Sequence, residues 1–218
     1  MNLLNKRSGI VIGLFRDLFE CDGQRFGSPS LGVLGVSDGI EGVQWNAWYS
    51  RRDETAWLGV NLEGKQYDAW PIARLIEREL SHPRLLTEYR VRVARPEMVT
   101  VSWTRDAWQV SSRVRIRESR IAPTPIALDQ LDIYGWMRAL ECARECLDPK
   151  RKYRGRRRTN VTLLRSGQTV ERWISPHLQF KTRFDENAPH SLKQAKNDLE
   201  ILHEFATHHA RPITVGGG

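Results

Sequence analysis

Apolar and polar residues alternate along several short stretches in the first third of the chain. In residues 42–50, Val43, Trp45, Ala47 and Tyr49 alternate with Gln44, Asn46 and Trp48. A period of two is typical of a β-strand that buries one face. Similar patterns predict strands at about 31–37 and 55–65, with a turn near Asp53 between the second and third strands.

Other segments repeat their apolar residues with the period of an α-helix. Residues 9–20 place Ile10, Leu14 and Leu18 on one predicted face. Residues 190–206 carry a longer stripe, formed by Leu192, Ala195, Leu199, Leu202 and Phe205. Helices are also predicted at 69–80, where Pro71 suits the first helical position, and at about 127–147. Further strands are predicted near 87–95, 98–104, 108–118, 160–165, 168–173 and 177–184.

Together these elements predict an α+β fold, with a mixed β-sheet, flanking helices and one or two α-βββ-α cores. The segment "IAPTPI" contains two prolines and indicates a division near residue 122. The chain would then consist of an N-terminal part (1–122) and a C-terminal part (123–218), or of one continuous domain. A length of 218 residues is sufficient for either arrangement.

The composition is that of a soluble globular protein, with 40% apolar and 28% charged residues. The longest apolar run, "GIVIGLF" at 9–15, is too short to span a bilayer, and no secretion signal precedes it. Three cysteines are too few for a disulfide framework. Cys142 and Cys146 lie one helical turn apart and are either core thiols or half of a metal site. We therefore expect a cytoplasmic protein with no membrane partner.

A net charge of +8 predicts a polyanionic partner, either nucleic acid or an acidic membrane surface. The densest basic segment is "PKRKYRGRRR" at 149–158, which contains Lys150, Arg151, Lys152, Arg154, Arg156, Arg157 and Arg158. Such a segment repels itself unless a polyanion neutralises it, and nucleic-acid phosphates would do so. The alternative is a solvated, flexible loop.

Two predicted strands have arginine on one face and aliphatic residues on the other. Arg113, Arg115 and Arg117 alternate with Val114 and Ile116, and Arg90 and Arg92 alternate with Val91 and Val93. Like charges on neighbouring strands are destabilising, so an arginine array needs a compensating partner. Guanidinium groups match phosphate oxygens in a bidentate geometry, which favours nucleic acid over a membrane. The alternative is that nearby carboxylates neutralise these arginines.

The third predicted strand ends in an acid and a lysine on its polar face, Glu63 and Lys65. A hairpin that turns near Asp53 would place Glu63 opposite position 43, within reach of Glu41 and Asp38. Carboxylates bind Mg²⁺ through oxygen, and the metal lowers the pKa of a bound water. A lysine would stabilise the charge that develops on a phosphate under attack. The pattern predicts a magnesium-dependent site for phosphodiester hydrolysis.

This segment resembles the PD-(D/E)XK nuclease superfamily, which includes many restriction endonucleases. The superfamily core is α-βββ-α, with an acid on the second strand and E-x-K on the third. The resemblance covers roughly residues 8–81. It implies that Glu41, or Asp38, is the first acid and that Glu63 and Lys65 form the E-x-K pair. Glu41, Glu63 and Asp38 would then be the metal ligands, and Glu41, Glu63 and Lys65 the catalytic residues.

A second candidate frame lies in "VERWISPHLQFKTRF", at residues 170–184. A hairpin here would bring Glu171 opposite Gln179 and Lys181, and some nucleases of the superfamily tolerate Gln in place of the second acid. This frame lies beside the basic segment but lacks a second carboxylate. A third possibility is that neither frame is catalytic.

"HEFATH" at 203–208 is not a zinc-protease motif, because its histidines are five residues apart and not four. His208 and His209 are expected at the frayed end of the last helix.

The leading hypothesis is a Mg²⁺-dependent endonuclease of restriction or phage-defence type. Its partner would be double-stranded DNA, and it would act as a homodimer or within a larger complex. The alternative is a non-catalytic DNA- or RNA-binding accessory protein.

Overall fold

The computed structural model describes residues 3–29, 32–39, 42–63, 71–109, 114–120, 125–146, 157–162 and 169–210. The helices in these ranges are α1 (Leu3–Phe19), α2 (Pro71–Ser81), α3 (Ile133–Cys146) and α4 (Pro189–Ala210). The strands are β1 (Gln24–Ser28), β2 (Val33–Ser37), β3 (Val43–Ser50), β4 (Thr55–Glu63), β5 (Thr100–Gln109), β6 (Val114–Arg120), β7 (Ile126–Ala127), β8 (Arg157–Thr162) and β9 (Thr169–Phe184). None of the described helices combines the length and the apolarity that a membrane span requires.

All of these strands belong to one nine-stranded sheet with the order β1-β2-β3-β4-β9-β5-β6. β7 adds to β5, and β8 adds to β9. The α+β class is confirmed, but each described pairing is antiparallel, and the sheet is therefore not the mixed sheet that we predicted. Strands from both sides of residue 122 take part, since β9 lies between β4 and β5.

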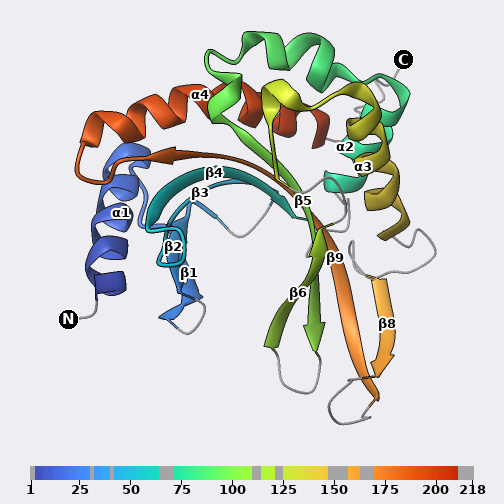
Figure 1. Cartoon of the computed structure of the whole chain (residues 1–218), viewed down its shortest axis with the longest axis horizontal. Coiled ribbons are helices and arrows are strands. Elements are labelled where there is room, and N and C mark those ends of the chain that lie inside the picture. Colours follow the sequence, from blue (N-terminus) through green and yellow to red (C-terminus); the bar gives the residue numbers. More distant parts are fainter. Residues whose placement is uncertain are drawn as a thin grey trace, which may run out of the picture.

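β9 is a single strand of 16 residues that joins two regions of the sheet. Its second half pairs with β4, whereas its first half pairs with β8. β5 follows its other edge over Arg172–Lys181. We call β6, β8 and the adjoining parts of β5 and β9 the arm, which extends away from the helices in Figure 1. Pro176 lies between the β4 and β8 pairings, where the absent N–H removes no bond to either strand.

The continuous β9 overturns the second candidate frame. The predicted hairpin between Glu171 and Gln179 is wrong, because both residues lie on the same strand. Eight residues of β-strand separate them by about 26 Å, and Lys181 is farther still. Glu171 therefore forms no compact site with Gln179 or Lys181.

The predicted strand at 87–95 is also wrong. Residues Leu85–Tyr89 form a π-helical turn and Arg90–Arg92 a 3₁₀ turn. The fully buried carboxylate of Glu79 accepts hydrogen bonds from the backbone N–H groups of Arg84 (3.0 Å) and Leu85 (3.1 Å), so it caps the start of the first turn.

The same turns remove Arg90 and Arg92 from the predicted arginine array. Arg90 donates to the carbonyl of Leu131 at 2.7 Å, and Arg92 lies 3.4 Å from the carboxylate of Glu204. Neither guanidinium belongs to the sheet.

The helices cover one face of the sheet, and Figure 1 shows α1 and α4 on the outside of the arch that β3 and β4 form. Ring contacts between strands and helices identify this face as the core: Trp45 with His203, Phe180 with Phe205 and Trp103 with Trp136. Trp45 lies on this face as the alternation predicted, but the opposite face of β3 and β4 is not solvent-exposed, since Gln44, Asn46 and Asn61 are 6–7% exposed.

The sequence predicted the buried face of α4 correctly and that of α1 only in part. All five residues of the predicted α4 stripe are buried. In α1, Ile10 is 36% exposed, and Leu4, Val11 and Phe15 are buried in its place. The predicted frayed end at His209 is wrong, because this residue is 2% exposed and packs 4.7 Å from the Phe205 ring.

Candidate nucleic-acid interface

The face of the sheet opposite the core carries polar and aromatic residues, and we call it the polar face. In the body of the sheet it includes Ser37, Gln44, Asn46, Trp48, Trp57, Asn61, Ser102, His177, Gln179, Lys181 and Arg183. Strand register aligns four of these residues in one row, Gln44, Asn61, Gln179 and Ser102. The amide and hydroxyl groups of this row can both donate and accept hydrogen bonds.

Two tryptophans and two cations form a stacked cluster on this face. Trp48 and Trp57 stack with ring centroids 6.2 Å apart and an interplanar angle of 13°. Lys181 Nζ lies 4.2 Å from the Trp57 ring centroid, and the Arg183 guanidinium lies 5.1 Å from it, both within cation–π range. The indoles are less than 10% exposed, whereas Arg183 is exposed. This part of the polar face therefore offers positive charge and not bare aromatic rings.

The strand register shows that the polar face continues along the strands of the arm. Positions Arg115, Trp108, Trp173 and Arg158 form a row across β6, β5, β9 and β8. Positions Arg117, Asp106 and Ser175 form the next row. Alternation along β9 places Trp173 and Ser175 in the same set as Gln179 and Arg183. At about 4.8 Å between strands, the two outer arginine positions of the first row are about 14 Å apart.

Three arginines predicted from the sequence are thereby brought to one face, Arg115, Arg117 and Arg158. Arg157 falls opposite Ile174 and alternates to the other face. The remaining predicted contacts lie outside the described residues: Arg113, Lys150, Arg151, Lys152, Arg154 and Arg156.

The predicted hairpin of β3 and β4 forms, with a register one residue from the predicted pairing of Glu63 with position 43. Val43 pairs with Leu62, so Glu63 falls opposite Gly42, and on its other side Glu63 pairs with His177 of β9. Alternation along β4 assigns position 63 to the polar face, with Asn61 and Trp57. Glu41 and Lys65 lie outside the described residues.

Asp38 has a structural role at this end of β3. Its Oδ1 accepts the backbone N–H of Trp45 at 3.0 Å, and its own N–H donates to the Trp45 carbonyl at 3.0 Å. Although the residue is exposed overall, desolvation of the carboxyl raises its pKa to about 6. Among the described residues, no three His, Cys, Asp or Glu side chains cluster as metal ligands would.

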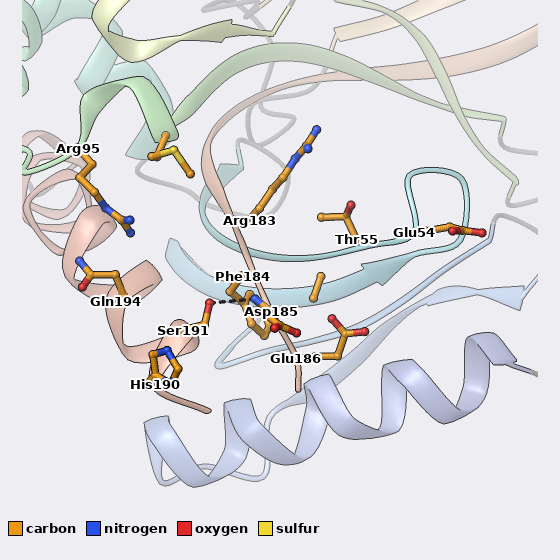
Figure 2. Close-up of a pocket in the computed structure, with 12 residues that line it drawn as sticks. Glu54, Thr55, Arg95, Arg183, Phe184, Asp185, Glu186, His190, Ser191 and Gln194 are labelled. Atoms are coloured by element: carbon orange, nitrogen blue, oxygen red, sulfur yellow. Dashed lines mark hydrogen bonds between the residues drawn. The ribbon is translucent and has the colours of Figure 1, made fainter. Parts of the chain in front are cut away.

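A pocket of about 510 Å³ lies where β9 leads into α4. It is lined by Glu54, Thr55, Ala56, Arg95, Met98, Arg183, Phe184, Asp185, Glu186, His190, Ser191 and Gln194. Figure 2 shows Arg95 and Gln194 on one side of this space and Glu54 on the other. No local sequence pattern could have indicated the pocket, because its lining comes from four separate segments of the chain.

Several pocket residues are held by partners of their own. Arg95 forms a bidentate pair with the fully buried Asp198, at 3.1 and 2.5 Å. Glu186 pairs with Arg7 of α1. The backbone N–H of Asp185 donates to Ser191 Oγ at 2.9 Å, shown as a dashed line in Figure 2. These bonds give the pocket a fixed frame.

No protein-family model, curated protein or solved structure matches this chain. The polar face and the pocket are therefore interpreted from their own chemistry.

Proposed function

We propose that this chain is a nucleic-acid-binding protein that holds a phosphate backbone against the polar face. The observation that carries the proposal is the continuity of this face along β9. Lys181 and Arg183 lie on it near one end, and arginine positions 115, 117 and 158 lie on it near the other. A net charge of +8 agrees with a polyanionic partner.

The dimensions of the face suit an extended polymer. The 16 residues of β9 span about 50 Å along the strand, which equals the length of roughly 15 base pairs of duplex. The cations would neutralise phosphates, and Gln179, the half-buried member of the row, would offer its amide to a sugar or base, whereas Gln44, Asn61 and Ser102 are 5–7% exposed and help to form the sheet itself.

Cross-linking tests where nucleic acid binds. Ultraviolet irradiation of the protein with a labelled 30-nucleotide strand, as DNA, RNA or duplex, is followed by mass spectrometry of the linked peptides. The proposal predicts linked peptides from β5, β6 and β9. Links confined to α1 and α3, which contact the core face, would contradict it.

A second candidate function is Mg²⁺-dependent endonuclease activity on double-stranded DNA, of restriction or phage-defence type and carried out by a homodimer. The observation that favours it is the register of Glu63, which falls opposite Gly42, one residue from Glu41, and within the polar face. Asp38 lies at the same end of β3. Mg²⁺ held by these acids would activate a water, and Lys65 would assist its attack.

The second candidate predicts that plasmid DNA is nicked in Mg²⁺ and that Glu63→Gln abolishes nicking while binding persists. Gln preserves the shape of the side chain and removes its charge, so loss of cutting alone identifies a chemical role. If plasmids of varied sequence stay intact in both Mg²⁺ and Mn²⁺ while they are bound, the protein is a binder and not a nuclease.

A further inference from the structure

The pocket at the end of β9 adjoins the polar face. Arg183 and Thr55 line the pocket, and strand alternation assigns both residues to the polar face as well. A polymer that follows β9 toward Arg183 therefore reaches the pocket at the point where the strand ends. The volume of about 510 Å³ is within the range of small-ligand sites.

The pocket offers both hydrogen-bond donors and acceptors from rigid elements. His190 and Gln194 come from the first turns of α4, and both are exposed. Arg95 is fixed by its bidentate bond to Asp198, so its guanidinium is oriented before any ligand arrives. Glu54 and Asp185 supply carboxylates from the β3–β4 turn and from the segment before α4.

The charge of the lining disfavours a phosphate. Three carboxylates, Glu54, Asp185 and Glu186, face two guanidiniums, Arg95 and Arg183. Two of these groups already have ion-pair partners outside the pocket, Arg95 with Asp198 and Glu186 with Arg7. The remaining charged groups are the carboxylates of Glu54 and Asp185 and the guanidinium of Arg183, and their net charge is negative.

A neutral nucleoside satisfies such a lining. Amino groups of a base and hydroxyls of a sugar donate to carboxylates, and ring nitrogens and carbonyls accept from amide or guanidinium N–H groups. We propose that the pocket binds the unphosphorylated terminal nucleoside of a nucleic-acid strand lying on the polar face. This inference rests on the proposed function, and it adds recognition of a strand end to binding of the backbone.

The test compares one oligonucleotide in four forms: linear with both ends hydroxylated, linear with a 5′-phosphate, linear with a 3′-phosphate, and closed into a circle. The oligonucleotide is used either single-stranded or double-stranded, whichever of the two the protein binds more tightly. Two or three hydrogen bonds in the pocket predict about tenfold tighter binding of the hydroxylated linear form than of the circle. A phosphate on the recognised end should remove that preference.

Two variants assign the preference to the pocket. Gln194→Ala should bring the linear form to the affinity of the circle, whereas Asn197→Ala, an exposed position one turn along α4, should not. Glu54→Gln should restore part of the affinity for the phosphorylated end, because it removes one of the carboxylates that repel phosphate. Substitution of Arg95 would not be informative, because it would leave the buried carboxylate of Asp198 without its ion-pair partner.

The outcomes separate this inference from the proposed function. Equal affinity for linear and circular forms overturns end recognition and leaves backbone binding in place. A preference for the linear form that survives Gln194→Ala and a terminal phosphate also overturns it. If neither form binds, both the proposed function and the pocket assignment are wrong.

Discussion

Gly59 shows how one residue shapes the polar face. A Cβ added at this position would lie 2.7 Å from Asn46 Oδ1, 3.1 Å from the Trp48 ring and 3.2 Å from the Phe180 carbonyl oxygen. Separations this short force neighbouring groups to move, and a strand carbonyl moves only with its sheet. Glycine at this position therefore lets Asn46 and Trp48 pack close to the centre of the sheet.

We expect Gly59→Ala to destabilise the protein by about 1–3 kcal/mol, the usual cost of overpacking. The free energy of unfolding would be measured by urea denaturation, with the combined emission of the eight tryptophans of the chain as the signal. Gly9→Ala in α1, where an added Cβ meets nothing within 4 Å, is the matched control. A Gly59→Ala protein as stable as the wild type would contradict the packing described here.

His209 makes folding sensitive to acid. Its imidazole is 2% exposed, and neither ring nitrogen has a hydrogen-bond partner among the described residues. The nearest acid oxygen, Glu79 Oε1, is 3.8 Å from Nδ1. Burial lowers the pKa of His209 to about 4, so the imidazole stays neutral in the folded chain to lower pH than in the unfolded chain.

This lowered pKa fixes the sign of a pH effect. Its contribution to stability is complete above pH 6.5 and is lost as the pH falls toward 4, because only the unfolded state then binds the proton. Between pH 7 and pH 5 the free energy of unfolding should fall by about 2 kcal/mol from this group.

The variant His209→Phe should lose less stability over the same pH interval than the wild type. Burial also raises the pKa of Glu79, with the opposite effect on the slope, so the difference between the two proteins is the informative quantity. His82→Phe at an exposed site controls for the removal of a histidine. Identical pH slopes for wild type and His209→Phe would contradict the assignment.

At the scale of elements, the sequence predicted best where apolar residues are confined to the face that packs against the core. Alternation of apolar and polar residues in β3 and β4 and the stripe in α4 were sufficient, because contact with the core imposes the period of the element on its apolar residues. Alternation failed at 87–95, where the aliphatic positions follow a π-helical turn capped by Glu79 from another helix. The sequence pattern also predicted two strands in place of the continuous β9, because Ser175 and Pro176 resemble a turn. In the structure Pro176 lies in the gap between the two partner strands β4 and β8.

The candidate site was predictable only in part, for the same reason. The face shared by Asn61 and Glu63 follows from strand alternation within one element. Pairing of β9 with β4 and β5, which brings Lys181 and Arg183 over Trp57, depends on contacts between residues far apart in the chain. No local pattern encodes that pairing.

The end of α4 is capped by arginines from another helix. Arg78 Nη1 donates to the carbonyls of His208 (2.7 Å) and His209 (3.1 Å), and Arg74 donates to that of Ala210 (2.5 Å). The last carbonyls of a helix have no hydrogen-bond donors within the helix, so the arginine N–H groups take the place of water as their donors. The α2–α4 contact thus depends on charged caps as well as on apolar packing.

We expect Arg78→Ala to weaken the last turn of α4 by about 1 kcal/mol. Hydrogen exchange of a peptide covering 203–210 would be about fivefold faster than in the wild type, while exchange in β4 would not change. Arg138→Ala, on the exposed surface of α3, is the control. Unchanged exchange at 203–210 would show that packing alone fixes this end.

At the scale of the whole molecule, the two faces of the sheet differ in what they carry. Its core face binds four helices and provides stability, and its polar face continues into an arm that lies beyond the helices (Figure 1). Positive positions are spread along about 50 Å of β9 and its neighbours. Under the proposed function this surface would neutralise several phosphates at once, and the salt dependence of binding would count them.

The most direct test of this account is the slope of log affinity against log salt for a 30-base-pair duplex. Each lost phosphate contact reduces the slope by about 0.9, so the combined change of Arg115, Arg117 and Arg158 to Gln should reduce it by about 2–3. The combined change of Arg138, Arg144 and Lys193 to Gln removes the same charge from α3 and α4, outside the polar face, and should leave the slope near that of the wild type. Equal slopes for the two triple variants would contradict binding at the polar face.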